Sequence, residues 1–141
     1  MAQQALDVYR QAWRKIDAAY AAPASRDWET EIRRYMADPR ALQVLNAING
    51  LVEDHVHTAG QTEISASVIG IEGTGNGAKV TIEACVDSTG GDLLDATGNS
   101  VLVPQEVGPR IKQYANVFRY SDSDGGWLLG ENTAPQPYQP C

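Results

Sequence analysis

Hydrophobic residues recur every three or four positions in the first part of the chain, which is the period of an amphipathic helix. Two such stripes come first, and each is closed by a proline-containing stretch, at 21–25 and at 38–39. The large side chains of the first stripe are Leu6, Tyr9, Trp13, Ile16 and Tyr20, and those of the second are Trp28, Ile32, Tyr35 and Met36. The pattern predicts one long helix and one short helix.

A third stripe, over residues 42–56, predicts a third helix. We expect Asp38 to cap its N-terminus, with Pro39 in the first helical position. Its apolar residues cover a wide arc, which is typical of a helix packed between a sheet and other helices. We expect the helix to end near His57, before Gly60.

Beyond residue 60 the hydrophobic period falls from about 3.6 to 2, which indicates β-strands. Apolar and polar residues alternate over 62–72 and 79–87, and the Gly- and Asn-containing stretch between these segments favours a hairpin turn. A second hairpin is predicted from 113–121 and 127–131. The stretch 92–104 has two short apolar runs, typical of either a small projecting hairpin or an irregular flap.

This order of elements predicts an α+β fold, in which N-terminal helices lie on one face of a curved antiparallel sheet. A length of 141 residues suits a single domain over 1–141. Its helical half covers about 2–58 and its sheet half about 61–132, and a Pro-rich tail follows at 133–141.

The positions of the two cysteines predict a disulfide. Cys85 alternates with the apolar residues of its strand, so its thiol projects from the polar face. Cys141 ends a tail whose prolines favour an extended path across a surface. A bridge between them would restrict the unfolded chain and so stabilise the folded state by roughly 4 kcal/mol. It would also imply an oxidising compartment. The alternative is two unrelated reduced thiols.

Charge is divided unevenly along the chain, whose net charge is −7. Residues 1–40 carry seven basic and six acidic side chains, whereas 41–141 carry four basic and twelve acidic ones. An acidic sheet half argues against binding phosphate backbones, so we expect no nucleic-acid partner. No run of about eighteen apolar residues occurs, so we expect no membrane span in this chain.

Ionisable residues concentrate in the run Glu53-Asp54-His55-Val56-His57. On a continuous helix His55 and His57 would lie about 200° apart and could not hold one metal ion together. Asp54 and His57 would share a face and are weak candidates for a general acid or base. The alternative is a polar helix C-terminus whose imidazoles favour the helix dipole. The sequence contains no motif for a metal or a cofactor, and we expect neither.

One face of the predicted strand 113–121 carries the side chains that are the best candidates for the wall of a ligand cavity: Tyr114, Asn116, Phe118 and Tyr120. Tyr114 is also a weak catalytic candidate. Asn116 is either a ligand contact or a polar group on a solvated face. The alternative for the aromatic residues is a place in the core. The run 122–126 resembles a calcium loop, but it lacks the distant Glu and is interpreted as a hairpin turn.

Several short motifs resemble those of the nuclear transport factor two-like (SnoaL-like) family, in particular its small extracytoplasmic proteins and lipoprotein ectodomains of actinobacteria and their phages. These motifs are Tyr35-Met36-Ala37-Asp38-Pro39, Ala84-Cys85-Val86-Asp87-Ser88, Asp95-Ala96-Thr97-Gly98, Gly126-Trp127-Leu128-Leu129 and the terminal Cys141. The resemblance implies a cystatin-like cone, in which the helices pack into the concave side of a bent sheet. In enzymatic members of the family, the cavity between them holds Asp, His or Tyr for proton transfer.

Together these features favour a non-enzymatic binding or accessory domain that is secreted or displayed on the cell surface. Its first residues lack the regions of a signal peptide, so a secretion signal or a lipid anchor would belong to a segment absent from this chain. We expect a protein partner at the cell envelope or a small apolar ligand. For a phage-encoded chain, analogy implies blocking of infection by related phages. Two alternatives are an isomerase or dehydratase using Asp54, His57 or Tyr114, and a self-associating module that dimerises through its sheet.

Overall fold

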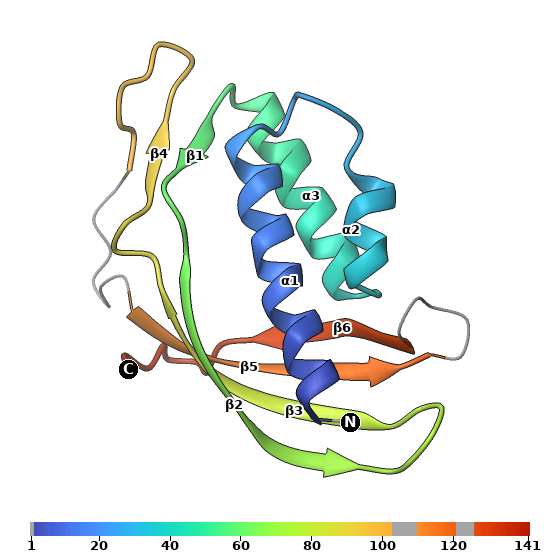
Figure 1. Cartoon of the computed structure of the whole chain (residues 1–141). Coiled ribbons are helices and arrows are strands. Elements are labelled where there is room, and N and C mark those ends of the chain that lie inside the picture. Colours follow the sequence, from blue (N-terminus) through green and yellow to red (C-terminus); the bar gives the residue numbers. More distant parts are fainter. Residues whose placement is uncertain (1, 103–109, 121–125) are drawn as a thin grey trace.

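The computed structural model describes residues 2–102, 110–120 and 126–141. Within them, three helices precede six strands (Figure 1). The elements are α1 (Ala2–Ala21), α2 (Glu29–Tyr35), α3 (Arg40–Glu53), β1 (His57–Ala59), β2 (Glu63–Glu72), β3 (Lys79–Asp87), β4 (Asp92–Leu94), β5 (Arg110–Arg119) and β6 (Trp127–Thr133). The helices cover one face of a curved antiparallel sheet, which confirms the predicted α+β class. None of the described helices is both long and apolar enough to cross a membrane.

The main sheet has four strands in the order β2-β3-β5-β6, and all neighbours are antiparallel. Burial alternates strictly along β3, so every second side chain faces the helices. β1 and β4 form a separate two-stranded sheet, in which His57 pairs with Leu94. This small sheet extends beyond the main sheet along α1 (Figure 1). A further bridge joins Leu94 to Ser100, so the stretch after β4 folds back as a projecting hairpin, one of the two alternatives predicted there.

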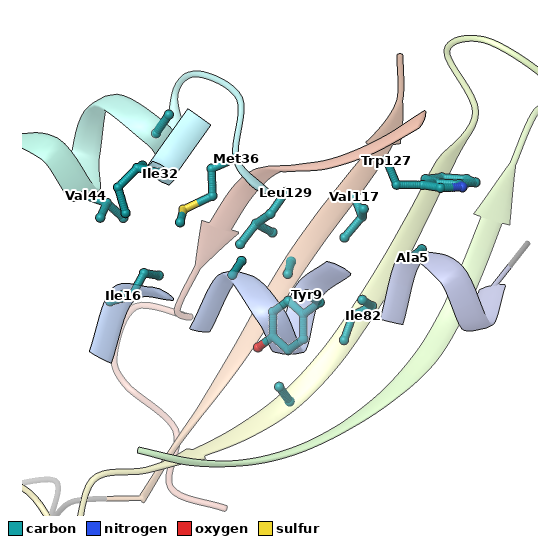
Figure 2. Close-up of a cluster of buried hydrophobic side chains, with 14 of the residues drawn as sticks. Ala5, Tyr9, Ile16, Ile32, Met36, Val44, Ile82, Val117, Trp127 and Leu129 are labelled. Atoms are coloured by element: carbon teal, nitrogen blue, oxygen red, sulfur yellow. The ribbon is translucent and has the colours of Figure 1, made fainter. Parts of the chain in front are cut away.

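The core lies between α1 and the concave face of the main sheet. Figure 2 shows side chains of α1, among them Tyr9 and Ile16, together with Ile82, Val117 and Leu129 of the sheet. The buried residues of α1 are Ala5, Tyr9, Ala12, Ile16 and Ala19. Alanines therefore occupy the line of closest approach, because their small side chains let the helix backbone come near the sheet. The predicted stripe is wrong in this respect: Leu6, Trp13 and Tyr20 pack only partly buried against the core.

The end of α3 also differs from the prediction, because the helix stops at Glu53 and His57 belongs to β1. The N–H of Val56 donates to the carbonyl of Leu51, and that of His55 to the carbonyl of Val52. These two bonds, with His55 at φ 55°, form a Schellman motif, which terminates a helix with a residue in the left-handed conformation. The sequence concealed this end because histidine occupies a position that glycine usually takes.

The start of α3 is displaced as well. The N-cap is Pro39 rather than Asp38, and no side chain caps the helix. Asp38 accepts a hydrogen bond from Arg33 at 3.0 Å instead, so its carboxylate serves an ion pair at the end of α2. The predicted strand 113–121 begins earlier than expected, at Arg110. The predicted turn at 122–126 lies outside the described residues except for Gly126.

Candidate functional site

The disulfide between Cys85 and Cys141 is present, as predicted. The two Cα atoms lie 5.8 Å apart across a sequence separation of 56. Cys85 projects from the face of β3 that points away from the helices. The tail reaches it by pairing with the first residues of β5, where the N–H of Lys112 donates to the carbonyl of Gln139 at 2.8 Å. The Pro-rich tail therefore takes over as the neighbour of β5 where β6 has ended.

The face predicted as a cavity wall lies on the opposite side of the sheet from the helices, so this prediction is wrong. Ala115 and Val117 are buried against the helices, and the alternating residues Tyr114, Asn116 and Phe118 consequently face outward. Tyr120, just beyond β5, is 37% exposed, and its ring meets that of Phe118 edge-on at 6.5 Å.

Asn116 belongs to a polar row across this outer face. Its side-chain oxygen accepts a hydrogen bond from the Thr81 hydroxyl at 2.8 Å, and its side-chain nitrogen donates to Glu131 at 2.9 Å. Of the two alternatives for Asn116, the structure favours a polar group on an outer sheet face.

The three catalytic candidates are not brought together. Asp54 is the exposed C-cap of α3, and His57 lies in the small sheet. Tyr114 lies on the outer face of the main sheet, opposite Thr133 of β6. The main sheet therefore separates Tyr114 from Asp54 and His57, so Tyr114 cannot act with them on one substrate atom, because general acid–base catalysis requires hydrogen-bond reach.

A groove at the end of the helices instead collects both histidines. It has a volume of about 550 Å³, within the range typical of small-molecule sites. Its walls come from the α1–α2 connection, the end of α3, the start of β1 and the hairpin after β4. The described lining residues are Ala21, Ala22, Pro23, Ala24, Ser25, Leu51, Val52, His55, Val56, His57 and Ala96.

The Schellman turn is what places His55 and His57 in this same groove. A continuous helix would have put them on different sides, whereas the left-handed residue turns the chain between them. Leu51 and Val56, which bracket the turn, both contribute to the apolar lining. Sequence reasoning missed the groove because its walls are far apart in sequence.

The groove combines an apolar surface with two imidazoles that can donate or accept hydrogen bonds. No carboxylate occurs among its described lining residues. Across the described part of the chain, no group of three or more His, Cys, Asp and Glu side chains is placed to hold a metal ion. This chemistry suits the apolar part of a ligand or partner together with one polar group.

A second cluster that sequence reasoning missed surrounds Trp13. The guanidinium carbon of Arg40 lies 5.6 Å from the centroid of the Trp13 ring. Burial lowers the pKa of Arg40. Burial also raises the pKa of Tyr9 to about 12, although the neighbouring Trp13 indole and Arg40 guanidinium favour its phenolate. Arg40 and Trp13 belong to different helices, so no local sequence pattern indicated their contact.

Comparison with known proteins identifies the fold but no family. No family model matches this chain, and no curated protein matches it. Among solved structures, it is similar to the intermembrane space region of the chloroplast protein ARC6, with a TM-score of 0.60 and 11% identity over 100% of this chain and 98% of that chain. A de novo designed β-sheet protein aligns with a TM-score of 0.36 at 14% identity, over 99% of this chain and 92% of that chain. At 11% identity the likeness to the ARC6 region shows a shared fold alone.

Proposed function

We propose that this chain is a non-enzymatic binding domain that works in an oxidising compartment outside the cytoplasm. The observation that carries the proposal is the disulfide between Cys85 and Cys141. Stable disulfides form and persist in oxidising compartments, whereas cytosolic thiols are kept reduced. The bridge also fixes the last residue of the chain to the sheet, so the tail belongs to the folded domain.

The packing of the concave face argues against a catalytic cavity there. Tyr9, Ile82, Val117 and Leu129 each have an exposed fraction of 0%. They occupy the space in which an isomerase or dehydratase of the resembled family would hold its substrate. The apolar groove beside His55 and His57 is the better binding surface.

The finer parts of the proposal follow from the family resemblance. A small apolar ligand, or apolar side chains of a protein partner at the cell envelope, would occupy the groove. Tethering as a lipoprotein ectodomain, and exclusion of related phages by a phage-encoded chain, extend the same proposal.

Thiol labelling in cells tests the compartment. Cells that produce the protein from its native gene are lysed in the presence of a maleimide-polyethylene glycol reagent, without reductant. We expect no mass shift for the unchanged chain and one added label for Cys141→Ser, which frees the thiol of Cys85. Two labels on the unchanged chain would show reduced thiols and would contradict the proposal.

Titration with the apolar dye N-phenyl-1-naphthylamine tests the groove. Val52 lines the groove and is 37% exposed, so Val52→Glu places a charge in it. Leu42 is a matched control, because it is 51% exposed on the same helix and is not among the lining residues. We expect Val52→Glu to weaken dye binding at least about fivefold and Leu42→Glu to leave it within about twofold. Equal affinity of both variants and the unchanged chain would rule out the groove as the apolar site.

Self-association is a second candidate, favoured by the edge strand β2. Ile69 and Ile71 are 52% and 50% exposed on this strand, whose outer edge has no neighbour among the described strands. An exposed apolar edge strand is a template for pairing with another chain. Sedimentation velocity tests it: a dimer that Ile71→Lys converts to a monomer would support self-association, and a monomer at all concentrations would exclude it.

A further inference from the structure

A small pocket between α1 and the start of β2 is separate from the groove described above. Its volume is about 260 Å³. The described residues that line it are Arg10, Trp13, Arg14, Asp17, Thr62 and Ile64. The four residues from α1 follow the helical repeat and share one face of the helix. We propose that this pocket binds a small organic oxyanion, a carboxylate or a phosphate, against the indole of Trp13.

The arginines around Trp13 have no anionic partner. Arg10 and Arg14 line the pocket, and Arg40 lies over the Trp13 ring. Within the described residues, none of the three forms an ion pair, whereas Arg26, Arg33 and Arg110 do. Two arginines that share the pocket lining with Trp13, and a third over its ring, contrast with a chain whose net charge is −7. Arg10, Arg14 and Arg40 therefore supply positive charge near Trp13.

The second arginine–tryptophan pair of the molecule shows the contrast. Arg26 lies 4.8 Å from the centroid of the Trp28 ring, and its guanidinium also pairs with Glu31 at 3.2 Å. The Arg26 guanidinium therefore contacts both an aromatic ring and a carboxylate. The Arg40–Trp13 pair has only the ring.

The one carboxylate among the lining residues is already engaged. Asp17 Oδ2 accepts the N–H of Thr62 at 3.0 Å, and Oδ1 accepts the Thr62 hydroxyl at 2.8 Å. These bonds hold the Asp17 carboxylate on the first residues leading into β2. Asp17 thus joins α1 to the sheet, and Arg10, Arg14 and Asp17 together leave the lining with one net positive charge.

One buried donor in the same cluster has no acceptor. Within the described residues, the Nε of Arg40 is buried without a hydrogen-bond partner, whereas the Trp13 indole interacts with the Tyr9 hydroxyl. Buried polar groups are nearly always hydrogen-bonded, so the unpaired Nε of Arg40 indicates a missing acceptor beside the Trp13 ring. An oxyanion supplies several acceptor atoms at once, and the planar guanidinium matches carboxylate and phosphate geometry. Trp13 and Ile64 provide apolar contact for the organic part of the ligand.

Calorimetry and Trp fluorescence test the proposal on the full chain. The probes are benzoate, phenyl phosphate and inorganic phosphate, at an ionic strength held constant with sodium chloride. We expect saturable binding of at least one probe, with a change in the emission of Trp13 that is lost in Trp13→Phe. Tighter binding of benzoate would assign a carboxylate ligand, and tighter binding of a phosphate probe would assign a phosphate ligand.

Charge-matched variants separate a site from general attraction. Arg14→Gln removes an exposed arginine of the pocket, and Arg34→Gln removes an exposed arginine of α2 that has no ion pair among the described residues. We expect Arg14→Gln to weaken binding at least about tenfold and Arg34→Gln to change it less than about twofold. The double variant Arg10→Gln/Arg14→Gln should abolish saturation while the far-UV circular dichroism stays unchanged. Equal effects of Arg14→Gln and Arg34→Gln, or no binding of any probe up to about 10 mM, would overturn the proposal.

Discussion

The two faces of the main sheet are built from the same strands but are held by different forces. On the inner face, Val80, Ile82 and Val117 are completely buried beneath the helices, so the hydrophobic effect dominates. On the outer face, a disulfide links the C-terminal tail to β3, and the strands are joined by the polar row through Asn116 and by an ion pair between Lys112 and Glu83 at 3.2 Å.

The contrast teaches how a sheet covered on one side only can be stable. Burial on the inner face is non-directional and sums over many contacts. Each polar contact on the outer face remains partly in water and contributes little. The covalent bridge is the exception, because it acts on the unfolded chain rather than through burial.

Removing the disulfide on the outer face is expected to have the largest effect on stability. Replacing both cysteines in Cys85→Ser/Cys141→Ser should lower the free energy of unfolding by about 4 kcal/mol, because the bridge closes a long loop in the unfolded chain. Denaturant unfolding at neutral pH measures this. A loss below about 1 kcal/mol would mean that the bridge adds little to the outer face.

Two neighbouring residues of β3 compare the faces directly. Ile82 faces the core and Thr81 faces outward, so Ile82→Ala should cost about 3 kcal/mol through the cavity it leaves. Thr81→Ala removes the hydrogen bond to Asn116 and should cost about 1 kcal/mol. Equal losses in chemical denaturation would show that the two faces do not differ in this way.

Alkaline pH should act on the inner face. The pKa of Tyr9 is raised by burial from an ordinary value near 10 to about 12, so the unfolded chain ionises before the folded one. The stabilising contribution is complete below pH 10 and is lost as the pH rises toward 12, by up to about 3 kcal/mol. Tyr9→Phe should flatten this part of the stability profile, and an unchanged slope in that variant would assign it to other groups.

Gly130 tests packing on the outer face, because the Phe118 ring covers this glycine. A Cβ at position 130 would lie 2.8 Å from a ring carbon of Phe118, which is too close for an unchanged ring. Gly130→Ala should therefore cost about 1–3 kcal/mol through overpacking. Adding Phe118→Leu should recover part of the loss in a double-mutant cycle, whereas strictly additive losses would argue against this contact.

The smallest effect is expected for the ion pair on the outer face. Both side chains of Lys112 and Glu83 are 35% exposed, so water and salt screen their attraction. Lys112→Gln should change stability less than Thr81→Ala does. The effect of Lys112→Gln on stability should vanish in concentrated sodium chloride. An effect that persists there would indicate that packing of the lysine stem contributes instead.

The sequence by itself determined the class of fold and the pairing of the cysteines. Both follow from local periodicity, because a period near 3.6 defines the helices and a period of 2 puts Cys85 on the face opposite Ile82 and Ala84. The proline-containing tail could then reach only an outer surface. The disulfide and the order of helices and strands were predictable for this reason.

Only the tertiary structure decided which face of β5 meets the helices and where α3 ends. Both faces of β5 carry apolar residues, so alternation alone could not distinguish Ala115 and Val117 from Tyr114 and Phe118. His55 adopts a left-handed backbone conformation that a histidine in the sequence does not predict. The groove and the arginine cluster around Trp13 join segments distant along the chain, and such contacts are set by the packing of whole elements.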